Sequence, residues 1–345
     1  MTRRNDSPNS IVIIMPNWVG DVVMATPLIE AIHESYPQVK IDFILKPHLL
    51  GLMNDAPWYS QAITLAKDKS FWALKSEIAA KRYDWGISLP NTIRPAALML
   101  LGKVKRRIGY ARNGRSPMLT DRLPFPYFSR KKMTPFRMVD FYGKIGELLG
   151  APNPVRPVKL YVRDEVVEKA NQIFEQNGIT DAKPVIGINP GAKYGSSKLW
   201  PAEHFAETAD RLAKQTGHQI AILAGPGEDE LAVQIRDQMK GDAVALPSED
   251  VDLETLKAVV KRLDLMVTND TGPRQIAAAF DVPNVAIFGP THTTWGNTGF
   301  EQSRELFIEV DCGPCMERTC PLAHHKCMTD LKPDRVVAAA MELMA

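Results

Sequence analysis

The chain has 345 residues, of which 45% are hydrophobic and 24% charged, and its net charge is +2. These values are ordinary for a globular protein and exclude an intrinsically disordered or fibrous chain. The length exceeds that of most single domains, so two domains are expected.

The first half of the chain predicts strands alternating with helices, as in a parallel sheet covered by helices. The expected elements are strand 11–15, helix 22–35, strand 41–45, strand 85–89 and helix 94–101. The apolar run 11–15 is too short for a signal-peptide core or a membrane span. A cytoplasmic protein is therefore expected.

Asp21 follows the first predicted strand, at the end of the loop Pro16–Asp21. This places it at the carboxyl edge of the sheet, where open α/β folds bind ligands. An Asp at the start of a helix is also a common N-cap. The pattern leaves both roles open, helix cap and catalytic group.

Positive charge is concentrated between Arg94 and Lys144, where thirteen Lys or Arg face two Asp, a net charge of +11. Such runs are often solvated faces, but this asymmetry favours an anionic partner. Few aromatic residues for base stacking lie among the charges, so nucleic acid is not expected. The densest groups are Lys105, Arg106 and Arg107, and Arg130, Lys131 and Lys132.

The segment 151–158 (APNPVRPV) is rich in proline and predicts a linker, after which the alternation restarts. The expected elements are strand 185–189, helix 202–214, strand 219–224, helix 228–239, strand 243–246, helix 253–262, strand 264–268, helix 273–280, strand 284–288 and a last helix 334–344. The predicted domains are 1–155 and 156–330, both Rossmann-like, followed by a C-terminal helix, 331–345.

Three loops of the second half follow predicted strands and suit a phosphate or a sugar. They are 189–198 (NPGAKYGSSK), 224–228 (AGPGE) and 269–272 (NDTG). Because the carboxyl ends of parallel strands share one edge, the loops are expected to converge on one crevice. Taken singly, each is also compatible with a solvated turn or an ordinary helix N-terminus.

Two further patterns suggest metals. Asp250–Asp252 has the D-x-D form of some sugar transferases, but a helix follows directly, so Asp252 is expected to be an N-cap and no catalytic metal is predicted. All four cysteines, Cys312, Cys315, Cys320 and Cys327, are clustered, which favours a structural zinc over disulfides in a reducing compartment. Their intervals match no common zinc module, so a reduced, metal-free loop remains an equal alternative.

In combination, the motifs VGDVVMATPLIEAI, NPGAKYGSSKLWP, AGPGEDE and NDTGPRQIAAAFDVPNVAIFGPT resemble the lipopolysaccharide heptosyltransferases of glycosyltransferase family nine. The resemblance covers the chain from Ile11 onward. It implies a GT-B architecture, an α/β fold of two Rossmann-like domains whose parallel sheets face a central cleft. The N-terminal domain would bind mainly the acceptor and the C-terminal domain mainly ADP-heptose.

The resemblance also implies roles for single residues. Asp21 corresponds to the general base and Lys198 to the lysine facing the diphosphate. Gln275 stands where many relatives have His, and it cannot carry charge near neutral pH. The implied donor-binding residues are Lys193, Tyr194, Gly195, Ser196, Ser197, Glu228, Val251, Asp270, Thr271, Gly272 and Gln275. The expected acceptor-binding residues are Asn17, Trp18, Arg94, Lys105, Arg106, Arg107, Arg130, Lys131 and Lys132.

The implied function is inverting transfer of heptose from ADP-heptose to a heptosyl-Kdo-lipid A acceptor, at the inner-membrane surface and without a catalytic cofactor. The alternatives are transfer to another core position, a related nucleotide-sugar transferase, and a nucleotide-sugar-binding protein without activity. A nicotinamide dehydrogenase is disfavoured because no G-x-G-x-x-G follows either opening strand.

Overall fold

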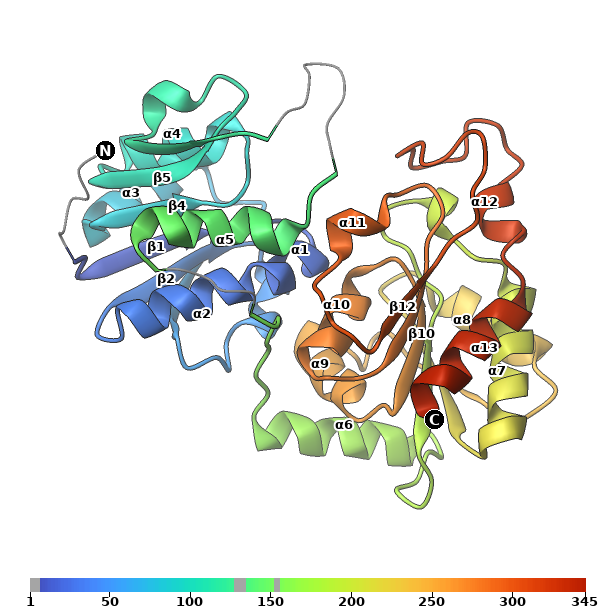
Figure 1. Cartoon of the computed structure of the whole chain (residues 1–345). Helices are drawn as coiled ribbons and strands as arrows, with labels where there is room; N and C mark the ends of the chain where they lie inside the picture. The colour runs from blue at the N-terminus through green and yellow to red at the C-terminus, as the bar shows by residue number, and fades with distance from the viewer. Residues whose placement is uncertain (1–6, 127–134, 152–155) are drawn as a thin grey trace. The chain divides into compact units, whose positions relative to one another are not determined.

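The structure, a computed structural model, describes residues 7–126, 135–151 and 156–345. The chain divides into two compact units, Met1–Arg156 and Pro157–Ala345. Each unit is built on a six-stranded sheet in which every strand pair is parallel (Figure 1). Within the described ranges, no helix is both long and apolar enough to cross a bilayer.

The sheet of the first unit has the order β3-β2-β1-β4-β5-β6. Its strands are β1 Ser10–Ile14, β2 Lys40–Leu45, β3 Tyr59–Thr64, β4 Trp85–Ser88, β5 Arg106–Ala111 and β6 Asp121–Pro124. Its helices are α1 Val19–Met24, α2 Thr26–Ser35, α3 Phe71–Lys81, α4 Ile93–Leu101 and α5 Met138–Leu149, with short 3-10 turns at Pro47–Leu52 and Ser116–Met118. The three predicted strands, β1, β2 and β4, are confirmed.

The predicted helix 22–35 is wrong in one respect, because it is two helices that meet at Ala25. Pro27 lies in the first turn of α2, where its missing N–H costs nothing. The same proline could not continue α1, since its ring clashes with the carbonyl one turn earlier. The break leaves α1 as a short helix directly after β1.

The second unit has the order β12-β11-β10-β7-β8-β9. Its strands are β7 Val185–Asn189, β8 Gln219–Leu223, β9 Val244–Leu246, β10 Leu265–Asn269, β11 Asn284–Ile287 and β12 Ser303–Leu306. Its helices are α6 Asp164–Gln176, α7 Ala202–Thr216, α8 Asp229–Gln238, α9 Leu253–Lys261, α10 Gly272–Ala279, α11 Thr293–Gly296, α12 Lys326–Thr329 and α13 Pro333–Met344. The predicted strands and helices of this half are confirmed, with small shifts at their ends.

Both sheets have the same order when each is numbered from its own first strand, that of a Rossmann fold. The order reverses between β1 and β4 in the first unit and between β7 and β10 in the second. Every residue of β7 and β10 is buried. In such folds the ligand crevice lies beyond the carboxyl ends of the two strands at this switch point.

Helices cover both faces of the second sheet. One face packs α7, α8 and α13 against the strands, through side chains such as Phe205, Ile235 and Val336, all completely buried. Helices α6, α9 and α10 pack together elsewhere in the unit (Figure 1). Each fully buried large apolar side chain contributes about 1.5–3 kcal/mol. The last helix is therefore an integral part of the second unit.

Candidate functional site

Two loops of the second unit are locked together at the switch point. Asn189 ends β7 and donates from Nδ2 to Thr268 Oγ1 at 2.9 Å and to Thr271 Oγ1 at 3.1 Å. The completely buried Asn269, at the end of β10, donates from Nδ2 to the carbonyl of Pro190 at 2.5 Å. Buried amides with fixed partners make this edge of the sheet rigid.

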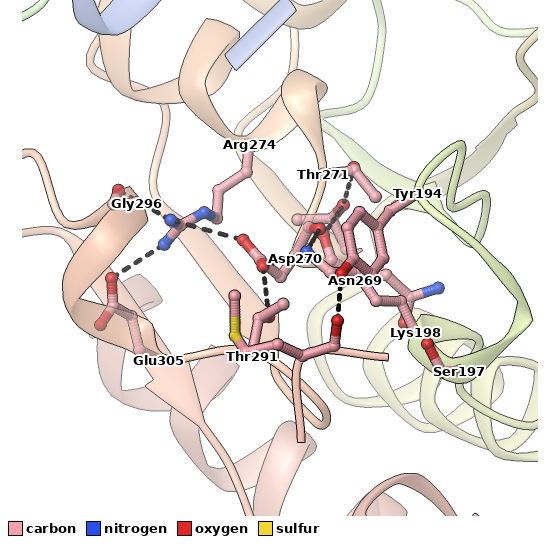
Figure 2. Close-up of polar contacts among 12 residues, drawn as sticks. Tyr194, Ser197, Lys198, Asn269, Asp270, Thr271, Arg274, Thr291, Gly296 and Glu305 are labelled. Carbon is pink, nitrogen blue, oxygen red and sulfur yellow. Dashed lines mark hydrogen bonds and ion pairs between the residues drawn. The ribbon is translucent and has the colours of Figure 1, made fainter. Parts of the chain in front are cut away.

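A lysine and a carboxylate form an ion pair at this edge (Figure 2). Lys198, 8% exposed, donates from Nζ to Asp270 Oδ2 at 2.5 Å and to the Asp270 carbonyl at 3.0 Å. Thr291 Oγ1 donates to the same carboxylate oxygen at 2.8 Å. Arg274, in the first turn of α10, lies 3.6 Å from Asp270 Oδ1. The ammonium of Lys198 is thus held at Asp270, two residues before the start of α10.

The charge state of Asp270 follows from these neighbours. Burial alone would raise its pKa, but the charges of Lys198 and Arg274, with hydrogen bonds from Lys198 and Thr291, outweigh it and lower the pKa below the usual value. Arg274 is in turn paired with Glu305 at 2.8 Å. Asp270 is therefore an ionised acceptor at neutral pH.

Glu228 brings the third predicted loop to the same edge. It occupies the N-cap position of α8 without capping it, and instead accepts from the Gly225 amide at 3.0 Å. A Cβ at Gly191 would lie 1.9 Å from Glu228 Oε2, and one at Gly225 would lie 2.7 Å away. Two glycines thus make room for this carboxylate between the loops after β7 and β8.

Asp252 is an N-cap, as predicted, because its Oδ1 accepts from the Thr255 amide at 2.8 Å. Its carboxylate is therefore engaged by α9 and is not presented as half of a D-x-D metal site. Val251, 9% exposed, directly precedes it after β9.

Gln275 has a partner within the protein. Its side chain is 4% exposed and donates from Nε2 to the Gly296 carbonyl at 2.7 Å. Arg274 donates to the same carbonyl at 2.7 Å. Arg274 and Thr291 were not predicted. The available signal for the first was an arginine four residues after Asp270, in the first turn of the helix predicted to follow it.

Two side chains of the predicted phosphate loop donate hydrogen bonds to backbone carbonyls of a distant segment. Tyr194 Oη donates to the Met316 carbonyl at 2.6 Å, and Ser197 Oγ donates to the Glu317 carbonyl at 2.6 Å. The exposed Ser196 and Lys193 lie on the open side of this loop, where Lys193 Nζ is 3.4 Å from the Pro226 carbonyl. Besides Lys198, the loop can offer an anion these two side chains and backbone amides.

The four cysteines and His324 line one cavity of about 50 Å³. All four thiols are free, and Cys312 Sγ lies 3.9 Å from His324 Nε2. Burial, then the neighbouring Cys315, Cys312 and Cys320, raises the pKa of Cys327. As the side chains stand, the described residues contain no group of three His, Cys, Asp or Glu already arranged around a metal position.

In the first unit, Asp21 lies in the first turn of α1, just after β1. The N-cap of this helix is Trp18, and no side-chain cap bond is made there, so the cap interpretation of Asp21 is wrong. Burial raises the pKa of Asp21 from 3.8 to about 6. The pKa of Tyr142 in α5 is raised by burial and then by the negative charge of Asp21. Asn17 and Trp18 are exposed beside it.

The basic residues between Arg94 and Lys144 lie in several different surroundings. Lys105, Arg106 and Arg107 lie at the amino end of β5, opposite Trp85 in register, and therefore at the other edge of the sheet from Asp21. Lys105 pairs with Asp84 at 2.7 Å. This placement does not bring the triplet to the candidate acceptor site.

The remaining basic candidates differ again. Arg94 is exposed in the first turn of α4, at the carboxyl edge. Arg115 is fully buried and donates to the Tyr110 carbonyl, Ser88 Oγ and Asn91 Oδ1, so part of the positive charge is structural. Arg130, Lys131 and Lys132 lie outside the described residues.

Comparisons with known proteins agree with this geometry. Residues 71–326 match the family model of glycosyltransferase family 9 (heptosyltransferase). The chain is 30% identical to lipooligosaccharide heptosyltransferase 2 of Campylobacter jejuni serotype O:2, over 97% of this chain and 98% of that protein. It also resembles the structure of the Escherichia coli ADP-heptose lps heptosyltransferase II, with a TM-score of 0.80 and 24% identity, over 97% of this chain and 98% of that one.

A third relative is the structure of a family 9 glycosyl transferase from Veillonella parvula, with a TM-score of 0.84 and 24% identity, over 97% of both chains. The structural matches establish the fold. The GT-B class predicted from the motifs is therefore confirmed.

Proposed function

The chain belongs to glycosyltransferase family 9, the heptosyltransferases, and from this premise we propose that it transfers a heptose from ADP-heptose to the inner core of lipopolysaccharide. The motifs point to the heptosyltransferase II group, whose acceptor would be heptosyl-Kdo-lipid A. The observation that carries the proposal is the buried Lys198–Asp270 pair at the switch point of the second sheet, with Glu228 at the same carboxyl edge.

The donor would bind along the carboxyl edge of the second sheet. Glu228 would accept from the ribose hydroxyls, and the backbone at Val251 would meet the adenine. The amides of Lys193, Tyr194 and Ser196 and the start of α10 would hold the diphosphate, because helix N-termini favour anions, whereas the amides of Gly195 and Ser197 donate to the Ala192 and Arg318 carbonyls. Asp270, Thr271 and Gly272 would contact the heptose and the phosphates. The side chains of Tyr194, Ser197 and Gln275 would act by holding the loops, given their protein partners.

The reaction would be an inverting displacement. An acceptor hydroxyl attacks the anomeric carbon while the bond from that carbon to the ADP oxygen breaks on the opposite face, and Asp21 takes the hydroxyl proton. Positive charge develops on the sugar ring and negative charge on the departing diphosphate. Lys198 and the backbone amides would neutralise the diphosphate. No catalytic metal is proposed, and the Asp252 carboxylate is engaged as a helix cap.

The acceptor would bind near Asp21. Asn17, Trp18 and Arg94 lie at the same edge of the first sheet, and an anionic core-lipid A acceptor suits Arg94. Arg130, Lys131 and Lys132 stay candidates for this role, whereas Lys105, Arg106 and Arg107 are not carried into it. Transfer to a lipid-anchored sugar further suggests peripheral attachment at the cytoplasmic face of the inner membrane, where each basic residue near anionic lipid contributes about 1 kcal/mol.

The decisive experiment is ADP release from ADP-heptose with acceptors that carry zero, one or two heptoses. Release with the acceptor bearing one heptose supports the proposal. Release only with another acceptor would place the enzyme at a different core position. ADP-heptose binding without release, on every acceptor, would leave a binding protein and refute transfer.

A glycine substitution tests the donor site. Gly191→Ala is expected to weaken ADP binding about tenfold or more, because the new Cβ would lie 1.9 Å from Glu228 Oε2 and displace the carboxylate from the ribose. Gly241→Ala is the matched control, since its Cβ would meet only Asp210 Oδ1, at 3.4 Å. Calorimetric titration with ADP measures both variants. Unchanged affinity in Gly191→Ala would remove Glu228 from the ribose site.

A second pair of variants tests the acceptor site. Arg94→Ala is expected to raise the acceptor KM about fivefold to tenfold, since a charge-assisted contact to an anion is lost. Lys105→Ala should leave this KM unchanged, because Lys105 lies at the opposite edge of the sheet and pairs with Asp84. Acceptor titration at saturating ADP-heptose gives both values. Equal effects from the two variants would show that only the overall charge matters.

A further inference from the structure

The cysteines belong to a segment that is attached to the donor site. We define the cysteine segment as residues 312–327. Its Met316 and Glu317 carbonyls accept from the side chains of Tyr194 and Ser197, and its Arg318 carbonyl accepts from the Ser197 amide at 3.1 Å. A Cβ at Gly195 would lie 2.2 Å from that same carbonyl, so the two backbones are in close contact. Three hydrogen bonds thus join the cysteine segment to the turn that carries Lys198.

The same segment contacts a second corner of the site. The Met316 amide donates to the Pro290 carbonyl at 2.8 Å, and a Cβ at Gly289 would lie 3.1 Å from Cys327 Sγ. Thr291, the next residue after Pro290, is a hydrogen-bond donor to Asp270. The cysteine segment therefore bridges the loops that supply both members of the Lys198–Asp270 pair.

The cysteine segment has little regular structure of its own. Residues 307–325, all described, contain no helix or strand, and most of them are exposed. A long loop without regular structure or a core of its own gains stability from a cross-link such as a bound metal. Besides the hydrogen bonds to 194–197 and Pro290, the feature that gathers the segment is the small cavity lined by its four thiols and His324.

We propose that Cys312, Cys315, Cys320 and Cys327 bind one Zn²⁺, and that this zinc clasps the cysteine segment so that it holds 194–198 in position for the donor diphosphate. The proposal rests on the proposed function only for the identity of the ligand. Zinc prefers four thiolates at about 2.3 Å in a tetrahedron. Rotation about χ1 moves a cysteine sulfur without moving the backbone, so four thiols around one cavity can converge when the metal enters.

The sulfur set is preferred to a set that includes the imidazole. His324 Nδ1 accepts from the Lys326 amide at 3.0 Å, which fixes the ring, and its Nε2 faces Cys312 at 3.9 Å. Binding of four thiols to Zn²⁺ releases their protons to solvent and changes no oxidation state. The imidazole would then be a hydrogen-bond partner of a bound thiolate rather than a ligand.

The test uses the full-length protein. Purified wild type is expected to hold about one zinc per chain by elemental analysis, as a closed Cys₄ site implies. Removal with a chelator should weaken ADP binding about tenfold, because the segment no longer holds the phosphate turn, and added Zn²⁺ should restore it. Far-UV circular dichroism checks that the chelated protein remains folded.

Two variants separate the metal from the contact. Cys315→Ser should lose zinc and ADP affinity together, while Thr319→Ala, at an exposed position of the same segment, should keep both. Gly195→Ala should keep the zinc and still lose ADP affinity, because its Cβ would collide with the Arg318 carbonyl. The last variant tests the contact even if Cys315→Ser fails to fold.

Two results would overturn the inference. One is a wild-type protein that binds ADP fully with less than a tenth of a zinc per chain. The other is a zinc-loaded protein whose ADP affinity is unaffected by chelation. Heptose transfer is measured separately on the zinc-loaded wild type. Loss of transfer there would refute the proposed function and leave the zinc result standing.

Discussion

Asp21→Asn is expected to lower kcat by about 10²- to 10⁴-fold while leaving ADP-heptose affinity nearly unchanged, because the change removes a proton acceptor and keeps the shape of the side chain. Asp21 is in the first unit, and the donor loops are in the second. ADP release under saturating substrates measures turnover, and calorimetric titration measures donor binding. Near-normal turnover in Asp21→Asn would exclude Asp21 as the base.

The pH profile gives a second readout of the same variant. A general base must be ionised, and the pKa of Asp21 is raised to about 6 by burial. We therefore expect kcat/KM of the wild type to fall as the pH drops below about 6, and this limb to disappear in Asp21→Asn. An ordinary aspartate would place the limb near ~3.9 and would be a weaker base.

The contribution of Asp21 to stability should fall as the pH rises, whereas its contribution to activity should increase. Because the folded pKa lies above the unfolded value of 3.8, the protonated form is favoured in the folded state, so this contribution is complete below 3.8 and is lost as the pH rises through about 6. Above that the ionised Asp21 costs at most about 3 kcal/mol, less where solvent reaches it. Asp21→Asn should therefore raise the melting temperature at pH 8 and not at pH 4.

Lys198→Met is expected to lower both turnover and stability. Loss of the ammonium that faces the diphosphate should cost about 10²- to 10³-fold in kcat. The same variant leaves the Asp270 carboxylate without its main partner. Because that side chain is only 16% exposed, removing one member of the buried pair should lower the free energy of unfolding by about 3–5 kcal/mol. Denaturant unfolding measures the second effect.

The double variant separates these two effects. Lys198→Met with Asp270→Asn removes both charges, so much of the lost stability should return. Turnover should stay far below that of Asp270→Asn alone, which is the matched control because Asp270 itself faces the donor. If the double variant turns over as fast as Asp270→Asn, Lys198 has only a structural role.

Sequence patterns predicted the centre of each sheet better than its edges. β7 and β10 are buried throughout and were recognised as apolar runs. β5 was missed because it opens with two arginines, and β12 because it is a short polar edge strand. Arg106 is stabilised in β5 by Asp121 and by the ring of Trp85, partners that only the folded sheet supplies.

The candidate site shows the same division. The loops after β7, β8 and β10 were found because parallel strands bring their carboxyl ends to one edge. The net charge of 94–144 indicated one anion-binding surface, but a count of charges does not contain their partners, and Arg115 and Lys105 proved to be engaged within the first unit. The hydrogen bonds of Tyr194 and Ser197 join residues more than a hundred positions apart, which no local pattern encodes.

Each unit is one uninterrupted stretch of chain, with a single boundary at Arg156. One crossover between two related genes at that point would therefore exchange a complete half of the enzyme and split no sheet. If the first unit binds the acceptor and the second binds the donor, as proposed, such a hybrid would take its specificity for the sugar nucleotide from one parent and its specificity for the lipid substrate from the other. New core structures would then arise by shuffling halves rather than by rebuilding a pocket residue by residue.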